Sequence, residues 1–355
     1  MTYLDHNATS PLRPEARAAM ERAMEIGGNP SSIHAAGRAA RALIEKAREQ
    51  VAALANARPQ DVIFTSGGTE ANASALSGAI YGAIDQDDRF TRLFVSAIEH
   101  DSVLANAHAL AERVAGLRIA TIPVTADGAI DTEALRVMLR EGKGRTLIAA
   151  QAANNETGVI QPVAEIARLA KDANALLLVD AIQAAGKIEL NIDADYLSLS
   201  SHKIGGPQGV GALIVREGTP FAAQVLGGGQ ERNHRAGTEN VIGVAGFGAA
   251  AAAAKANLPT AVLRDRFERD MTKLGVTVFG AKADRLANTS NFALPEITAE
   301  TALMALDLDG VMVSSGAACS SGKVKTSHVL KAMNVADDMA ARALRVSFGW
   351  NSTEA

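Results

Sequence analysis

Two periodicities of apolar residues alternate along the first two-thirds of the chain. Amphipathic, alanine-rich stretches predict helices at residues 14–28 and 35–56, and the first begins with proline and ends with glycine, as helices tend to do. Short apolar runs between helical patterns predict strands at residues 61–65, 92–98, 117–124, 146–151, 175–180, 194–201 and 209–215. Strands that alternate with helices favour an α/β fold with a mainly parallel sheet covered on both faces.

The pattern changes after a predicted helix at residues 239–257, where the chain reads "NLP". Beyond this point helices mix with short strands and with a segment of small residues. A length of 355 residues fits about two domains of roughly 150 residues each. We therefore expect a large α/β domain over residues 14–255, and a smaller α+β domain formed by residues 1–13 and 256–355.

The composition is that of an ordinary soluble globular protein, with 48% apolar and 21% charged residues. A net charge of −4 gives no reason to expect a nucleic-acid partner. The most apolar run, "GVAGFGAAAAAAKANL", is too short and too weakly hydrophobic for a membrane span, and the N-terminus shows no secretory signal. We expect a cytoplasmic protein with no membrane partner. The single cysteine excludes an intrachain disulfide and any zinc site built on several cysteines.

A glycine-rich turn is the first candidate for chemistry. The segment "TSGGTEANASAL" follows a predicted strand and opens a predicted helix, and it holds Gly67, Gly68 and Thr69. Glycines allow a close backbone approach, and the amides and positive dipole end of a helix favour a phosphate there. The segment is not a P-loop, because the glycine–lysine–serine/threonine ending of that motif is absent. A turn with a threonine cap is the alternative interpretation.

Two further segments place ionisable residues after buried strands. Asp180 ends the strand in "LLLVDAIQAAGK", where ligands bind in open parallel sheets, although a helix N-cap would use the same residue. Lys203 follows a strand in "LSLSSHKIGGPQGVGAL". If that amine is partly desolvated its pKa falls and it becomes nucleophilic, whereas a solvated lysine would have no such role.

A phosphate cradle, a buried carboxylate and a nucleophilic lysine are together the parts that a pyridoxal 5'-phosphate (PLP) site needs. Two other polar residues follow strands and fit the same site: His100 in "AIEHDSV" and Asn155 in "QAANNETG". A packed histidine and a turn asparagine are the alternatives. His100 and His108 lie eight residues apart, which is not the spacing of a helical metal pair, and we propose no metal.

The order of these segments resembles that of the cysteine desulfurases of the nitrogen-fixation and iron–sulfur-assembly type, which are class V aminotransferase-like proteins. The resemblance runs from "YLDHNATSPLRPEA" to "ALRVSFG", nearly the whole chain. It also includes "GNPSSIHAAGRAAR", "FTSGGTEANA", "EHDSV", "NNETGVIQP", "VDAIQAAGK", "SSHKIGGPQGVGAL", "GGGQERNHRAGTEN" and "SSGAACSSG". It implies the fold of PLP-dependent transferases of fold type I, the aspartate aminotransferase type.

The resemblance also implies a role for each candidate residue. Lys203 resembles the lysine that bonds to PLP, Asp180 would pair with the ring nitrogen, and His100 would stack on the ring and take part in proton transfer. Arg345 resembles the clamp for the substrate carboxylate, in a substrate site that also includes Asn155. The remaining implied contacts are to the phosphate (Gly68, Thr69, Ser200, Ser201 and His202) and to the ring hydroxyl (Asn155 and Gln183).

Two implied residues serve other functions. Thr238, in "RAGTEN", would reach the phosphate bound in the other subunit, which implies a homodimer. Cys319 resembles the nucleophile that takes the sulfur of L-cysteine, leaving alanine and an enzyme persulfide for an acceptor protein such as an iron–sulfur scaffold. The small residues around Cys319 predict a mobile tether that could carry the persulfide to the acceptor.

Three other functions remain open at this point. A class V aminotransferase shares the lysine and the aspartate, and a selenocysteine lyase could use the same site. A non-catalytic sulfur carrier is disfavoured by the full set of cofactor residues. The chain ends at "GWNSTEA", whereas members of the resembled family usually continue for a few helical turns. Either the chain is trimmed or the small domain lacks its last helix. Whether a sulfur acceptor docks on the small domain is therefore also open.

Overall fold

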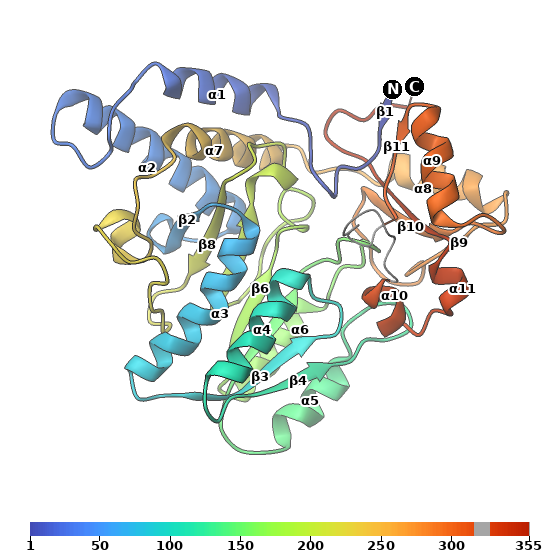
Figure 1. Cartoon of the computed structure of the whole chain (residues 1–355), viewed down its shortest axis with the longest axis horizontal. Helices are drawn as coiled ribbons and strands as arrows, with labels where there is room; N and C mark the ends of the chain where they lie inside the picture. The colour runs from blue at the N-terminus through green and yellow to red at the C-terminus, as the bar shows by residue number, and fades with distance from the viewer. Residues whose placement is uncertain (316–326, 355) are drawn as a thin grey trace.

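A seven-stranded sheet forms the centre of the larger part of the molecule (Figure 1). The computed structural model describes residues 1–315 and 327–354, so Cys319 lies outside the described residues. The strand order is β2-β8-β7-β6-β5-β3-β4. The strands are β2 (Val62–Thr65), β3 (Phe90–Ser96), β4 (Arg118–Ile122), β5 (Arg145–Gln151), β6 (Leu176–Asp180), β7 (Tyr196–Ser200) and β8 (Gly211–Val215). The neighbours β4, β3, β5, β6 and β7 are parallel, and β8 runs antiparallel to both β7 and β2.

Helices cover both faces of this sheet because its central strands bury side chains on both sides. In β5, Leu147 and Ala149 join one apolar cluster with α3 and α4, while Ile148 and Ala150 join a second cluster with α2, α5, α6 and α7. The covering helices are α1 (Pro14–Met24), α2 (Ala35–Ala55), α3 (Gly68–Asp85), α4 (Asp101–Arg113), α5 (Thr132–Arg140), α6 (Val163–Asp172) and α7 (Val241–Ala256). Short 3-10 helices lie at Pro59–Asp61, Ser201–Lys203 and Gln230–Asn233.

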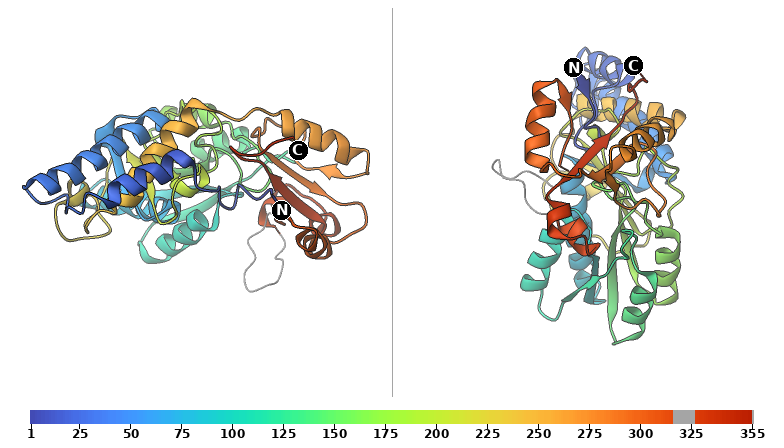
Figure 2. Two further views of the ribbon diagram at one scale, coloured as in Figure 1. Left: turned by 90° about the horizontal axis from the view of Figure 1, so that it is seen from above. Right: turned by 90° about the vertical axis from the view of Figure 1, so that its right-hand side faces the viewer.

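The C-terminal elements form a second group with two small sheets and their own apolar clusters. One sheet has the antiparallel order β12-β10-β9, from β9 (Thr277–Val278), β10 (Thr289–Ala293) and β12 (Ala343–Ser347). The other pairs β1 (Thr2–Tyr3) with β11 (Val311–Met312), so the start of the chain lies among the last elements (Figures 1 and 2). The helices are α8 (Val262–Thr272), α9 (Ala299–Leu308), α10 (His328–Ala332) and α11 (Asp337–Ala340).

The predicted mainly parallel sheet with helices on both faces is confirmed. All seven predicted strands are present, and the helix predicted at residues 239–257 is Val241–Ala256. The first helix ends earlier than predicted, at Met24. The division into domains at residues 13/14 and 255/256 stays a prediction. Within the described residues, none of the helices combines the length and the apolar character that crossing a bilayer would require.

Candidate active site

The sheet brings the candidate residues to one edge. Strands β2, β3, β5, β6 and β7 all point the same way, so their carboxyl ends meet there. Asp180 is the last residue of β6, and the 3-10 turn that holds Lys203 follows β7 directly. The glycine turn at Gly67 and Gly68 follows β2 and opens α3.

A hollow of about 390 Å³ lies at the N-terminus of α3. Gly67 has φ +156°, and Gly68 is packed so closely that an added Cβ would lie 2.3 Å from the Ile182 side chain. The turn therefore requires glycine, and the helix start faces the hollow as an anion site would. The lining residues are Ala8, Thr9, Ser66, Gly67, Gly68, Thr69, Glu70, Ser200, His202, Gln208 and Gly209. Four of the five predicted phosphate residues are thus together, while Ser201 is fully buried and does not line the hollow.

Lys203 lies beside this hollow with its amine held by backbone oxygens. Its Nζ donates to the carbonyl oxygens of Asn7 at 2.6 Å and Ala8 at 2.9 Å. Burial, with the nearby Arg345 charge, lowers the pKa of Lys203 to about 8. Burial and the Lys203 charge also lower the pKa of His202 to about 4, so this imidazole is neutral at pH 7. With this lowered pKa, Lys203 becomes a neutral, nucleophilic amine at a lower pH than an ordinary lysine does.

Asp180 is a buried carboxyl group with two hydrogen-bond donors. The backbone N–H of Ile182 donates to its Oδ1 at 2.9 Å, and Asn72 Nδ2 donates to its Oδ2 at 2.7 Å. Burial raises the pKa of Asp180 despite these donors. A cation placed against this carboxylate would offset the desolvation, which is what a protonated ring nitrogen provides. His100 caps α4 nearby and connects to Asp180 through Ser102 and Asn72.

Arg345 on β12 is oriented by two oxygen acceptors. Its Nη1 donates to the carbonyl oxygen of Asn155 at 3.0 Å, and its Nη2 donates to Asp5 Oδ1 at 2.6 Å. The side chain is buried, and its Nε has no hydrogen-bond partner among the described residues. An unpaired donor on a buried guanidinium is suited to a carboxylate ligand.

The N-terminal segment supplies contacts that the sequence analysis did not assign. The Asn7 carbonyl oxygen accepts from both Lys203 and Gln183, and its side chain bonds to Lys187, Asn288 and Thr289. Thr9 lies 3.2 Å from His202 Nδ1. A run of polar residues before the first helix, "DHNATS", is the only local signal for this role.

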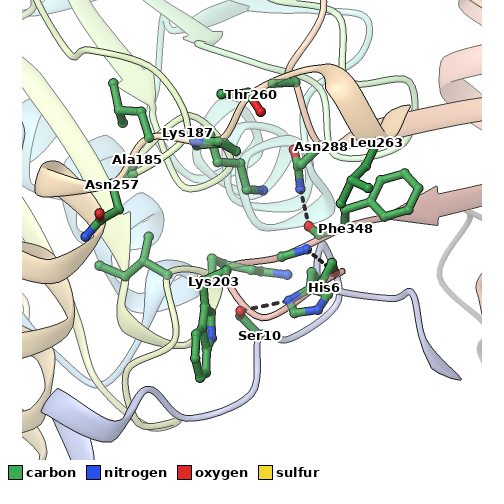
Figure 3. A pocket seen from close by; sticks show the side chains of 18 of the residues that line it. His6, Ser10, Ala185, Lys187, Lys203, Asn257, Thr260, Leu263, Asn288 and Phe348 are labelled. Atoms are coloured by element: carbon green, nitrogen blue, oxygen red, sulfur yellow. Dashed lines mark hydrogen bonds between the residues drawn. The ribbon is translucent and has the colours of Figure 1, made fainter. Parts of the chain in front are cut away.

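A second cavity, of about 440 Å³, is lined by Lys203 and by residues of the C-terminal elements (Figure 3). Lys187 contributes to its wall and is buried, with Nζ 2.6 Å from Gln183 Oε1 and 2.9 Å from Asn7 Oδ1. Burial, with the charges of Lys203 and Arg345, lowers the pKa of Lys187 well below its ordinary value. Because an amine donates to Gln183 Oε1, the amide nitrogen of Gln183 faces Asn7 and the active-site side.

Two predicted residues are not in this cluster. Thr238 is exposed and does not line the hollow, although Arg235 from the same loop pairs with Glu70 in its lining at 3.0 Å. Its predicted contact is with a partner subunit. The assignment of Cys319 lies outside the described residues.

Known proteins share both the sequence and the architecture of this chain. The profile of the family described as Aminotransferase class-V matches residues 2–355. The chain belongs to the aminotransferase class-V family. Within this family it is 44% identical over 362 residues to a cysteine desulfurase of Cereibacter sphaeroides, a match covering 99% of this chain and 92% of the relative. It is 41% identical to the cysteine desulfurase IscS of Dictyoglomus turgidum, over 99% of this chain and 90% of the relative.

Solved structures of the same family agree with the fold. A structure titled NifS-like protein has a TM-score of 0.90 and 33% identity, covering 99% of this chain and 95% of the other. The NifS-like protein of Rickettsia africae has a TM-score of 0.87 at 33% identity, with the same coverage. The expected fold type I is thus confirmed for this aminotransferase class-V chain.

The described residues of this aminotransferase class-V chain fit PLP. Gly67 and Gly68 line the hollow at the N-terminus of α3, where a helix start favours a phosphate. Asp180 is a buried carboxyl group whose ionised form a nearby cation would stabilise, and Lys203 is an amine with a lowered pKa. Anion cradle, carboxylate and amine match the three polar features of the cofactor, its phosphate, ring nitrogen and aldehyde.

Proposed function

We propose that this chain is a PLP-dependent cysteine desulfurase that converts L-cysteine to L-alanine and leaves the sulfur as a persulfide on Cys319. The observation that carries the proposal is the convergence of Lys203 and Asp180 at one sheet edge, beside an anion-binding hollow. Relatives about 40% identical over nearly the full length bear the name cysteine desulfurase, which supports the choice of substrate.

Each residue has a defined task in this proposal. Lys203 supplies the amine that bonds to the cofactor aldehyde, and Asp180 keeps the ring nitrogen protonated. When bound, PLP supplies an electron sink that stabilises negative charge at the substrate α-carbon. Arg345 orients the substrate carboxylate, and Gln183 and Asn155 present amide groups toward the ring hydroxyl.

Sulfur transfer is assigned to Cys319. Its thiolate attacks the sulfur of the substrate, so that a sulfur–sulfur bond forms while the Cβ–sulfur bond breaks. The electron pair stays with the substrate and a proton completes alanine. An acceptor protein, such as an iron–sulfur scaffold, then removes the persulfide sulfur.

The assembly and location are parts of the same proposal. Thr238 is exposed, as a residue that serves a partner's phosphate site would be in a single subunit. The family resemblance supports a homodimer, and the cytoplasmic location is the expectation from the composition. Sedimentation of the Thr238→Ala variant with and without PLP tests the first point, since a monomer that retains its cofactor contradicts a shared site.

The test of the function is a product assay on the purified chain loaded with PLP. L-cysteine and a reductant should give sulfide and alanine in equal amounts, and the Lys203→Ala variant should give neither. L-selenocysteine and a pair of amino acid and keto acid are run in parallel. Amino transfer without sulfide release would identify an aminotransferase and overturn the proposal.

A further inference from the structure

A chain of hydrogen bonds links Asp180 to His100 through the side chains of Asn72 and Ser102. Asn72 Nδ2 lies 2.7 Å from Asp180 Oδ2 and 3.0 Å from Ser102 Oγ. Ser102 Oγ lies 2.8 Å from His100 Nδ1. Asn72 is fully buried and Ser102 is buried, while His100 is exposed at the site. The chain therefore runs from a buried carboxyl group to an exposed imidazole.

The donors and acceptors fix the direction of every bond. Asp180 accepts at both oxygens, so the amide nitrogen of Asn72 must face it. The second amide hydrogen of Asn72 goes to Ser102 Oγ, which leaves the hydroxyl proton of Ser102 for His100. The directed order is Asn72 to Ser102 to His100.

A second donor reaches the same ring nitrogen. His100 is the N-cap of α4, and the backbone N–H of Ser102 donates to its Nδ1 at 3.1 Å. Nδ1 thus accepts from a backbone N–H and from a hydroxyl, and it also faces the positive end of a helix dipole. A nitrogen in this position carries a lone pair and no proton, so the ring proton of the neutral imidazole is on Nε2.

We propose that Ser102 is a positioning residue that holds His100 in the Nε2-protonated tautomer, so that the ring presents an N–H hydrogen-bond donor at Nε2. A proton could be taken up only at Nδ1, where both donors already point. The tautomer is a property of the resting protein, whereas the use of the Nε2 N–H as a hydrogen-bond donor during turnover rests on the proposed function.

The hydroxyl of Ser102 can be separated from its place in the helix. Alanine at position 102 keeps the backbone N–H that caps to His100, and alanine is the best helix former. Threonine keeps the hydroxyl. Ser102→Ala therefore removes one donor to Nδ1 and the link to Asn72, and Ser102→Thr restores both. Ser74→Ala, on α3 and outside this chain of bonds, serves as the matched control.

The first experiment reads the tautomer by NMR of the full chain with ring-¹⁵N-labelled histidine, with PLP bound and after its removal. The chain has seven histidines, and the signals of His100 are assigned by their loss in His100→Gln. We expect a pyrrole-type Nε2 and a pyridine-type Nδ1 in the wild-type protein. A pyrrole-type Nδ1 would overturn the proposal without touching the proposed function.

The second experiment compares the variants. In Ser102→Ala we expect the His100 nitrogen shifts to move toward a mixture of tautomers, and kcat for L-cysteine to fall about fivefold with KM within about twofold, as for the loss of one positioning hydrogen bond. Ser102→Thr should restore both readouts, and Ser74→Ala should change neither. Unchanged His100 shifts in Ser102→Ala would show that the hydroxyl does not position the ring. Wild-type protein with the expected shifts but no sulfide release would refute only the proposed function.

Discussion

Arg345 and Asp5 form an ion pair that joins the two ends of the chain, with Nη2 of the guanidinium 2.6 Å from Oδ1 of the carboxylate. Arg345 lies on β12, and Asp5 follows β1 and bridges to Ser347 on the same strand. Since Nη1 is also held, by the carbonyl oxygen of Asn155, the guanidinium is oriented before any substrate arrives. Preorganisation of this kind reduces the entropy that ligand binding loses.

Replacing Arg345 by lysine should raise KM for L-cysteine more than about tenfold and lower kcat less. A lysine keeps the charge but lacks the planar fork that holds Asp5 and Asn155 while binding a carboxylate. Steady-state kinetics measure the changes in KM and kcat separately. Arg342→Lys is the matched control, because Arg342 pairs with Asp338 on α11 and should leave KM within about twofold. An unchanged KM in Arg345→Lys would remove this residue from the substrate site.

The lowered pKa of Lys203 predicts how cofactor capture depends on pH. An ordinary lysine has a pKa of 10.5, whereas that of Lys203 is about 8. Below pH 8 most of the amine is protonated and cannot attack an aldehyde, and above pH 8 the neutral form dominates. The rate at which the cofactor-free protein captures PLP should therefore rise through about pH 8 and then level off. Stopped-flow absorbance gives the profile, and a rise that continues toward pH 10 would contradict it.

Borohydride trapping tests which lysine is used. Lys187 is also buried near the site and also has a lowered pKa, so it is the natural competitor. The Lys203 amine contacts Ala8, which lines the anion hollow, whereas the Lys187 amine contacts Gln183 and Asn7, which do not line it. Peptide mapping after reduction should find the label on Lys203, and Lys203→Ala should remain unlabelled. A label on Lys187 would reverse the two roles.

Asp180→Asn should retain PLP and lose activity by about a hundredfold or more, in the range of a lost acid–base contribution. An amide cannot hold the ring nitrogen protonated, and its NH₂ group cannot accept from Asn72. Cofactor content and turnover are measured on the same preparation. No helix follows Asp180 in the described chain before β7, so near wild-type turnover would reduce it to a residue that stabilises the turn through its bond from Ile182.

Local sequence patterns were sufficient to predict which candidate residues lie at the ends of strands. Lys203, Asp180 and Gly68 each lie where an apolar run gives way to polar or glycine residues, and the sheet then brings those points together. The direction of β8 also follows from physics. Only a short segment joins it to β7, and a parallel crossover needs a dozen or more residues, so the pair must be antiparallel.

Residues defined by distant contacts could not be predicted in this way. Asn7 bonds to groups 148 to 282 positions away, and Asp5 pairs with a residue 340 positions away. Nothing in their immediate neighbours marks these partners. Asn72 appears in sequence as one polar position within a helix, and only the packing of α3 against α4 and β6 gives it Ser102 and Asp180 as neighbours.

The buried ion pair between Arg48 and Glu231 also joins residues far apart in the sequence, and it contributes to stability. Two bonds of 2.7 and 3.0 Å join them, with both side chains almost fully buried, and Glu231 also accepts from the backbone N–H of Phe64. The pair anchors a turn in which residues 231–233 all have positive φ without glycine. It therefore holds the loop that leads to Thr238.

Arg48→Met should lower the free energy of unfolding by about 3 to 5 kcal/mol, because the Glu231 carboxylate would stay buried without its partner. Urea denaturation of the purified variant gives the change. Arg168→Met breaks an exposed pair with Asp172 and should cost about 0.5 kcal/mol or less. Equal, small effects in both variants would show that the buried pair is not an anchor.

Cys319→Ser should separate cofactor chemistry from sulfur transfer. Lys203 and Asp180 do not depend on the thiol, so the variant should fold, bind PLP and show the absorbance change on addition of L-cysteine. It should then fail to release sulfide, because a serine hydroxyl is far less nucleophilic than a thiolate at neutral pH. Mass spectrometry of the wild-type protein after one turnover without reductant should find one added sulfur atom on the peptide that holds Cys319. Sulfide release by the serine variant at the wild-type rate would show that another group receives the sulfur, since the chain has no second cysteine to replace it.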